Sequence, residues 1–386
     1  METNNETIQN KAIKRSFWGA LAFYLLIAFE FFYMAGPFAA YFYSVYAPAL
    51  NFFNQSPALS WLSSFFLPHV VEETSSGFLN FLLIARYVLA IAGFLAFCVG
   101  AIQVYYHKLA KKGIVTGGIY NHIRHPQYAS FIVCSFGLLF VWPRYIVAIM
   151  FVTMTFFYYL LAKAEEAECE RKFGQSYIDF KNRTGMFLPF KLFNGKLLSF
   201  LPALPKQRGK RVIAIICAYL FAIIAMLGVA KGLNKLTIEN LYAAHTENTV
   251  TVALCEISEE NIGKVMTIVL SDKTVKNKTG GFDSGAKFIN YILPTEWYAA
   301  EIPMNKIEHK RGHYSPSGYD RGLFKIILTK AYLRDRVTAT GKEILTSVYL
   351  REPIVEVWVN LSANAVVKIL DIPEEIMFKG IPVSVF

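Results

Sequence analysis

The chain has 386 residues, of which 54% are hydrophobic, 16% aromatic and only 17% charged. Soluble globular proteins carry about a quarter charged residues, so the composition excludes a purely soluble protein and indicates a membrane protein with an additional soluble part. The net charge of +11 comes from basic residues beside apolar runs, which favours anionic lipid headgroups as partners and argues against nucleic acid. The five cysteines occur singly, without a CxxC pair, and predict neither a disulfide framework nor a metal site.

The first 230 residues contain five apolar segments that predict a polytopic α-helical membrane domain. Residues 1–16 are polar and end in basic residues, so we expect a cytoplasmic tail. The next run exceeds the apolar region of a signal peptide, about 7 to 15 residues, and no clean cleavage site follows, so it predicts a first spanning helix. The predicted spans, which together form the membrane domain at 17–230, are residues 17–35, 78–106, 127–141, 145–162 and 212–230.

The third and fourth spans are joined at Trp142, Pro143 and Arg144 and predict a helical hairpin. Its first segment has only about 15 residues, fewer than the roughly 20 that cross a bilayer, so the hairpin is expected to be tilted or shallow. An amphipathic, basic segment follows at 163–211. The distribution of Lys and Arg places the N-terminus, the loop after the second span and this amphipathic segment in the cytoplasm. Five crossings leave residues 231–386 extracytoplasmic.

Residues 231–386 change in character and predict a β-rich soluble domain. Short β-branched or alternating runs are separated by Gly, Pro, Asn and Asp, which is the pattern of strands and turns. The expected strands are residues 249–257, 264–270, 323–329, 344–350 and 354–360. No catalytic signature occurs in this region, and the sequence leaves its role and any protein partner open.

A polar, basic loop runs into an apolar helix at residues 113–128, GIVTGGIYNHIRHPQY. Pro126 disfavours the α conformation at His125 and suits the first turn of a helix, so the loop ends at a helix N-terminus. The free N–H groups there favour a carboxylate or phosphate, and Arg124 adds a planar fork of donors. The glycines of the loop allow sharp turns and a close approach to a ligand. These features predict a cofactor site at the membrane surface.

A second motif, EEAECERKFGQSYIDFKNRTGMFLP, begins at Glu165 just after the hairpin. Together the two motifs resemble those of the isoprenylcysteine carboxyl methyltransferase and phospholipid N-methyltransferase group of membrane enzymes, GxYxxxRHPxY and EExxLxxxFGxxYxxY before a proline. The matching residues are Gly118, Tyr120, Arg124, His125, Pro126, Tyr128, Glu165, Glu166, Phe173, Gly174, Tyr177 and Pro189. Cys169 replaces the usual Leu and Phe180 the second Tyr. The resemblance does not extend to the C-terminal domain.

The resemblance implies S-adenosyl-L-methionine as the methyl donor, bound from the cytoplasm, and a lipid-like acceptor that enters from the bilayer. With Arg124 added for its fork of donors, the expected cofactor contacts are Gln103, Ile114, Val115, Tyr120, Arg124, His125, Pro126, Gln127 and Tyr128. Gln103 is the loosest of these, because its spacing to the loop differs slightly from that of the family's glutamine.

The expected catalytic residues are Arg124, Glu165 and Glu166. Methyl transfer is an in-line displacement that depends on positioning and on exclusion of water. The glutamates could complement the sulfonium or the ammonium of the cofactor, or accept a proton from an amine. Adjacent helical residues point about 100° apart, so we expect one of the two to face the site, with Glu165 preferred.

The acceptor and the function both have alternatives. Leu161 stands where the prenylcysteine enzymes carry an Arg that holds the acceptor carboxylate, which weakens that substrate and leaves a phospholipid amine or another lipophilic molecule. Sterol-type reductases that use NADPH share a similar RH-containing turn, but they typically carry Asn where this chain has Gln127. A third hypothesis is a non-catalytic anchor that presents residues 231–386, with Arg124 and His125 as juxtamembrane basic residues. The oligomeric state stays open.

Overall fold

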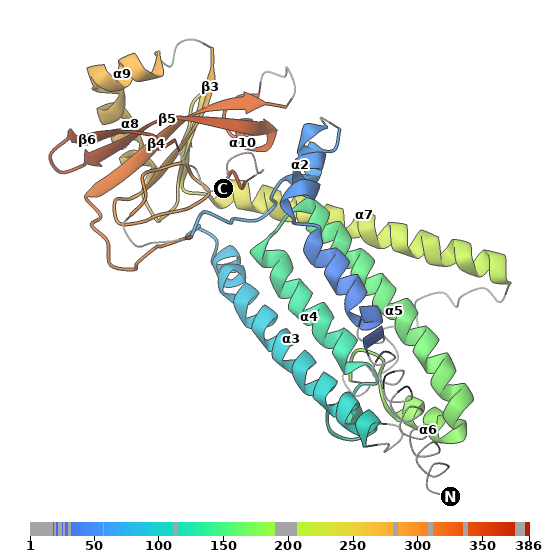
Figure 1. Cartoon of the computed structure of the whole chain (residues 1–386). Coiled ribbons are helices and arrows are strands. Elements are labelled where there is room, and N and C mark those ends of the chain that lie inside the picture. Colours follow the sequence, from blue (N-terminus) through green and yellow to red (C-terminus); the bar gives the residue numbers. More distant parts are fainter. Residues whose placement is uncertain are drawn as a thin grey trace, which may run out of the picture. The chain divides into compact units, whose positions relative to one another are not determined.

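The computed structural model describes most of the chain beyond residue 31 (Figure 1). The described residues are 32–56, 58–110, 115–189, 207–280, 285–307, 312–334, 339–374 and 383–386. A few isolated positions before residue 31 are also described. The chain divides into two compact units. Unit 1 comprises Met1–Tyr43, Ala96–Phe131 and Thr153–Phe200, and unit 2 comprises Ser44–Leu95, Ile132–Val152 and Leu201–Phe386.

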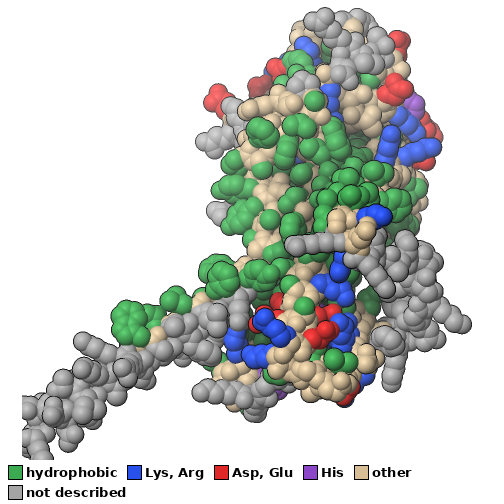
Figure 2. All heavy atoms as spheres, turned by 90° about the vertical axis from the view of Figure 1, so that its right-hand side faces the viewer, with side chains coloured by type: hydrophobic (Ala, Val, Ile, Leu, Met, Phe, Trp, Pro, Cys, Tyr) green, Lys and Arg blue, Asp and Glu red, His purple; other side chains and the backbone are tan. Residues whose placement is uncertain are grey.

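Among the described residues, three helices are long and apolar enough to cross a membrane: α3 (Gly77–Leu109), α5 (Tyr145–Phe173) and α7 (Arg208–Asn240). A fourth, α4 (Pro126–Val141), is shorter, as the sequence predicts for this arm of the hairpin. Many large apolar side chains of α3 and α7 are exposed, and Figure 2 shows a broad band of hydrophobic side chains over the helices. Such a surface suits lipid tails rather than water.

The predicted spans from 78 onward therefore correspond to helices, and the membrane character of the chain is confirmed. The first predicted span, 17–35, lies mostly outside the described residues, although residues 32–43 are helical. The number of five crossings and the sidedness of the loops stay predictions. Two shorter helical elements follow residue 43, namely α2 (Ala47–Gln55) and the 3-10 helix η1 (Ser60–Ser63).

Glycines let α3 and α4 approach closely within unit 2. A Cβ added at Gly137 would lie 2.4 Å from the backbone nitrogen of Ala90, and one added at Gly93 would lie 2.4 Å from that of Cys134. Both distances are far below a normal contact, so the two backbones touch where the side chains are absent. Small residues commonly allow such contacts between membrane helices.

The segment predicted to be cytoplasmic at 163–211 is helical over residues 163–173, 175–183 and from 208 onward, whereas residues 184–189 are not helical. Helix α5 continues to Phe173, so Glu165 and Glu166 lie in the last part of this long helix. The chain then turns at Gly174, whose φ of +54° favours glycine, and enters α6 (Gln175–Arg183). Residues 190–206 lie outside the described ranges.

The C-terminal region forms one mixed, six-stranded sheet in which the strands lie in the order of the chain. The strands are β1 (Ala243–His245), β2 (Thr249–Ala253), β3 (Lys287–Pro294), β4 (Leu323–Leu333), β5 (Val348–Asn360) and β6 (Ala365–Asp371). Strands β2 and β3 are parallel, and all other neighbours are antiparallel. Helices α8 (Glu259–Ser271) and α9 (Lys273–Thr279) connect the parallel pair, and α10 (Glu343–Ser347) precedes β5.

Two of the predicted strands are wrong in whole or in part. Residues 264–270 belong to α8, whose buried side chains Ile262, Val265, Ile268 and Val269 repeat every three or four residues, the period of a helix. Ser258 caps this helix by accepting a hydrogen bond from the backbone of Asn261 at 3.2 Å. Residues 344–350 begin in α10 and end in β5. Strands β1, β3 and β6 were not predicted, although β3 is almost wholly buried in the core.

Candidate functional site

The two sequence motifs meet within unit 1. Ile123 forms a β-bridge with Gly185, the residue that follows α6 by two positions. The backbone N–H of Arg124 donates to the carbonyl oxygen of Gly185 at 2.9 Å, and that of His125 donates to Met186 at 3.1 Å. The loop before the hairpin and the segment after α6 therefore run side by side.

Arg124 forms the centre of this junction. Its Nε donates to Oε1 of Glu166 at 2.7 Å, and its Nη1 donates to the carbonyl oxygens of Lys181, at 2.8 Å, and Thr184. Both charged side chains are buried, with 9% of Arg124 and 1% of Glu166 exposed. The guanidinium thus ties the loop to α5 and to the end of α6, and at least three of its five donors point at protein groups rather than at a ligand.

The adjacent glutamates diverge, as the geometry of a helix requires. Glu166 points inward, and besides Arg124 it lies 3.3 Å from Nζ of Lys181 and 3.6 Å from Nζ of Lys163. Glu165 is 42% exposed; its Oε1 accepts a hydrogen bond from the hydroxyl of Tyr128, and its Oε2 lies 3.3 Å from Nδ1 of His125. Glu165 is consequently the accessible carboxylate of the pair.

His125 lies between the two carboxylates. Its Nδ1 faces Glu165 and its Nε2 lies 3.8 Å from Oε1 of Glu166. Burial lowers the pKa of His125, but the hydrogen bonds and charges of Glu165 and Glu166 outweigh it and raise that pKa above the ordinary value of 6.5. The imidazole is therefore more fully protonated near neutral pH than a free histidine.

A stack of aromatic rings supports His125 and Tyr128. The ring centroids of His125 and Tyr128 are 5.6 Å apart, and those of Tyr128 and Tyr158 are 4.8 Å apart. Phe131 continues the stack, at 6.0 Å from Tyr158 with nearly parallel rings. Tyr158 is fully buried, and its hydroxyl donates to the carbonyl oxygen of Met34 at 3.1 Å. The stack fixes the first turn of α4, which begins at Pro126, against α5.

The glycine loop lies against α3. Gly118 opens the 3-10 helix η2 (Gly118–Asn121) with φ +61°, and a Cβ there would lie 2.0 Å from Nε2 of Gln103. The hydroxyl of Tyr120 donates to Oε1 of Gln127 at 2.7 Å. Val115 packs against the buried cluster that contains Tyr120. Gln103, Val115, Tyr120 and Gln127 thus lie around the glycine loop. Ile114 lies outside the described residues.

The chemistry of these residues fits S-adenosylmethionine. Within the described parts of the chain, Oε1 of Gln103 is buried and has no hydrogen-bond partner, and the buried Nε2 of His125 has only the distant Oε1 of Glu166, 3.8 Å away. A buried polar atom without a partner is costly, so each is suited to a polar group of a ligand. The half-exposed carboxylate of Glu165 and the aromatic faces beside it suit a cation, and the cofactor carries both an ammonium and a sulfonium.

These features define a class of membrane protein in which a basic loop, the first turn of a short apolar helix and a helix with paired glutamates meet in one cluster of polar side chains. Residues 74–176 match the sequence model of the phospholipid methyltransferase family. The matched range includes Gln103, the RHPQY turn and both glutamates, and it confirms the resemblance drawn from the motifs. This part of the chain is thus similar to membrane methyltransferases. No curated protein and no solved structure matches the chain significantly.

Sequence reasoning missed some residues of this site. Tyr158 carries the aromatic stack, and its position two helical turns before Glu165 on the same helix is the signal that could have identified it. The carbonyl groups of Lys181 and Thr184, which bind Arg124, leave no signal in the sequence because every residue carries a carbonyl.

Proposed function

We propose that the chain is an integral membrane methyltransferase that uses S-adenosylmethionine and methylates a lipophilic or lipid acceptor. The observation that carries this proposal is the convergence of Glu165, His125 and Tyr128 in the segment that matches the methyltransferase family. We further infer that the N-terminus and this site are cytoplasmic, and that residues 1–16, 17–230 and 231–386 form the tail, the membrane domain and an extracytoplasmic domain.

The residues of the site divide into two roles. S-adenosylmethionine supplies an activated methyl group on a sulfonium. Glu165 is the catalytic carboxylate, because it is accessible and its orientation is fixed by Tyr128 and His125. Arg124 and Glu166 are positioning residues, since their charges are buried against one another and hold the loop on α5 and α6. The exposed Glu165 therefore takes part in the reaction, whereas the buried Glu166 holds the surrounding segments in place.

The acceptor that suits this site best is a lipid amine. An ammonium must lose a proton before its nitrogen can accept a methyl group, and Glu165 is placed to take that proton. Leu161 offers no charge to hold an acceptor carboxylate, so a carboxyl methylation of the prenylcysteine type lacks its recognition group. A dry, lipid-facing site also favours the displacement, because water competes less for the sulfonium.

The first test measures ligand binding by the purified protein in detergent. We expect thermal stabilisation by S-adenosylmethionine and by its demethylated product, and none by NADPH. Stabilisation by NADPH alone would indicate a reductase of the sterol type, and no response to any of the three would favour a non-catalytic anchor.

The second test separates turnover from binding. With radiolabelled donor and a lipid extract, we expect Glu165→Gln to lower methyl incorporation by about 10²-fold or more, the contribution typical of a general base, with a smaller loss of donor affinity. The matched control is Glu170→Gln, which removes a similarly exposed carboxylate of the same helix. Equal turnover in wild type and Glu165→Gln would refute the assignment of the catalytic carboxylate.

A further inference from the structure

Unit 2 brings together two histidines and a glutamate from separate parts of the sequence. Nε2 of His69 lies 3.3 Å from Oε1 of Glu301, and Nε2 of His313 lies 2.7 Å from Oε2 of the same carboxylate. One potential ligand atom from each residue lies within 4.8 Å of the others. Imidazole nitrogens and carboxylate oxygens in this combination are the ligands that zinc takes in proteins.

The spacing of these atoms is close to that of a coordination sphere. Zinc binds nitrogen and oxygen at about 2.0–2.2 Å, so two ligand atoms of a tetrahedral site lie about 3.4 Å apart. The two observed contacts, of 3.3 and 2.7 Å, are shorter than this value, so the side chains would move slightly apart to admit an ion. A fourth position would remain for water.

The polar atoms of the cluster are incompletely paired, which is a second and independent observation. Among the described residues, Oε2 of Glu301 and Nδ1 of His69 are buried and have no hydrogen-bond partner. Nε2 of His313 lies 2.7 Å from that oxygen, a contact that an ion between the two groups would replace. A buried carboxylate oxygen without a hydrogen-bond donor is costly, whereas a cation between Oε2 of Glu301 and Nε2 of His313 would bind both atoms.

The surroundings hold the three side chains in place. The ring of His69 lies between those of Phe65 and Trp142, with centroids 5.0 Å from each. The segments that carry Glu301 and His313 are joined by two backbone hydrogen bonds of 2.8 Å between Tyr298 and Tyr314. His69 and Glu301 are buried, whereas His313 is 30% exposed and offers an ion a route from solvent.

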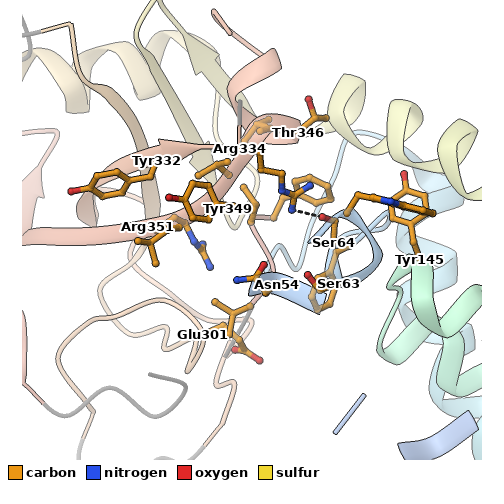
Figure 3. Close-up of a pocket in the computed structure, with 18 of the residues that line it drawn as sticks. Asn54, Ser63, Ser64, Tyr145, Glu301, Tyr332, Arg334, Thr346, Tyr349 and Arg351 are labelled. Carbon is orange, nitrogen blue, oxygen red and sulfur yellow. Dashed lines mark hydrogen bonds between the residues drawn. The ribbon is translucent and has the colours of Figure 1, made fainter. Parts of the chain in front are cut away.

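Glu301 also lines a neighbouring cavity, although its carboxylate oxygens contact the histidines. This cavity of about 910 Å³ is lined by Glu301, Lys231, Arg334 and Arg351, among others, and it includes none of the predicted methyltransferase residues. Figure 3 shows Glu301 at one edge, with its carboxylate turned away from the two arginines. The oxygens instead meet the two imidazoles, neither of which lines the cavity.

We propose that His69, Glu301 and His313 bind one divalent transition-metal ion, zinc by ligand preference. The ion would join the segment after η1 to the two loop segments between β3 and β4, and so stabilise unit 2. This proposal does not depend on methyl transfer, because all three ligands belong to unit 2.

The test is the zinc content of the full chain, purified in detergent with an affinity tag that contains no histidine. After loading with zinc and dialysis, mass spectrometry of the metal should give one zinc per chain in the wild type. Zinc should also raise the melting temperature. Loss of one ligand in His313→Ala should weaken zinc binding by at least about 100-fold, more than the change typical of a partner outside the first coordination shell.

The matched control is His245→Ala, which removes an exposed histidine of β1 in the same unit and should leave zinc content unchanged. Glu301→Gln tests the carboxylate without changing its size. If His313→Ala does not fold, cobalt bound to the wild type gives an independent measure through its visible spectrum. Zinc content that is equal in wild type and His313→Ala would overturn the proposal, as would a wild type that holds no zinc. The cluster would then be an ion-paired triad.

Discussion

Two buried glutamates show how differently the two units satisfy a charge. Glu166 in unit 1 faces a guanidinium and two lysine ammonium groups, so its charge is neutralised by permanent cations. Glu301 in unit 2 lies within 4 Å of two imidazoles, whose charge depends on pH. In each carboxylate Oε2 is buried and has no hydrogen-bond partner among the described residues. That oxygen lies beside two lysine ammonium groups in Glu166, whereas in Glu301 it lies beside an imidazole, a group that also binds metal ions.

The largest effect is expected from breaking the junction in unit 1. Arg124→Ala leaves Glu166 buried beside weaker partners, and loss of one member of a buried pair costs about 3–5 kcal/mol. We expect a large drop in the melting temperature together with loss of donor binding. Adding Glu166→Gln to Arg124→Ala should restore part of the stability, because it removes the uncompensated charge. A single variant as stable as the wild type would show that Arg124 is not the central cation.

A smaller effect is expected from the glycine loop, where local backbone geometry positions the site. Gly118→Ala places a side chain at a positive φ and against Gln103, which should cost about 1–3 kcal/mol and weaken donor binding. Gly117→Ala is the matched control, because its φ is −100° and a Cβ there meets no atom within 4 Å. Equal donor affinity in the two variants would contradict a close approach of the loop to Gln103.

His125 makes the stability of the unit 1 site depend on pH. Its pKa is raised in the folded protein, so the cationic form contributes stability that is fully present below the unfolded value of 6.5 and is lost as pH rises through the folded value. The difference in melting temperature between wild type and His125→Gln should therefore be largest near about pH 6 and shrink toward about pH 9. A difference that grows with pH would show that Glu165 and Glu166 do not stabilise the imidazolium.

The smallest effect is expected from Lys163. Its side chain is 46% exposed and its Nζ lies 3.6 Å from Glu166, so solvent screens the ion pair. Lys163→Ala should change stability by less than about 1 kcal/mol, in contrast to Arg124→Ala. Thermal melts of the two variants measure this contrast directly. Comparable losses would mean that Glu166 depends on its total positive surroundings rather than on one guanidinium.

The membrane helices and the motif-based site were predictable because their signals are local. Apolar length identifies α3, α5 and α7, and the RHP turn and the glutamate pair are contiguous motifs. The sheet was predicted less well, since α8 and the missed strand β3 both have apolar runs that short windows do not separate. The His69 cluster was not predictable. His69 and Glu301 are 232 positions apart, and only tertiary structure brings them together.

The order of the strands has a consequence for biogenesis. Because each strand of the C-terminal sheet lies beside its predecessor in the chain, a growing polypeptide can add one strand at a time to an edge that already exists. The parallel step from β2 to β3 needs a crossover, which α8 and α9 provide, and residues 295–322 join β3 to β4. Because each strand pairs with the next one in the chain, no connection has to span more than one step of the sheet, and this favours rapid assembly during synthesis.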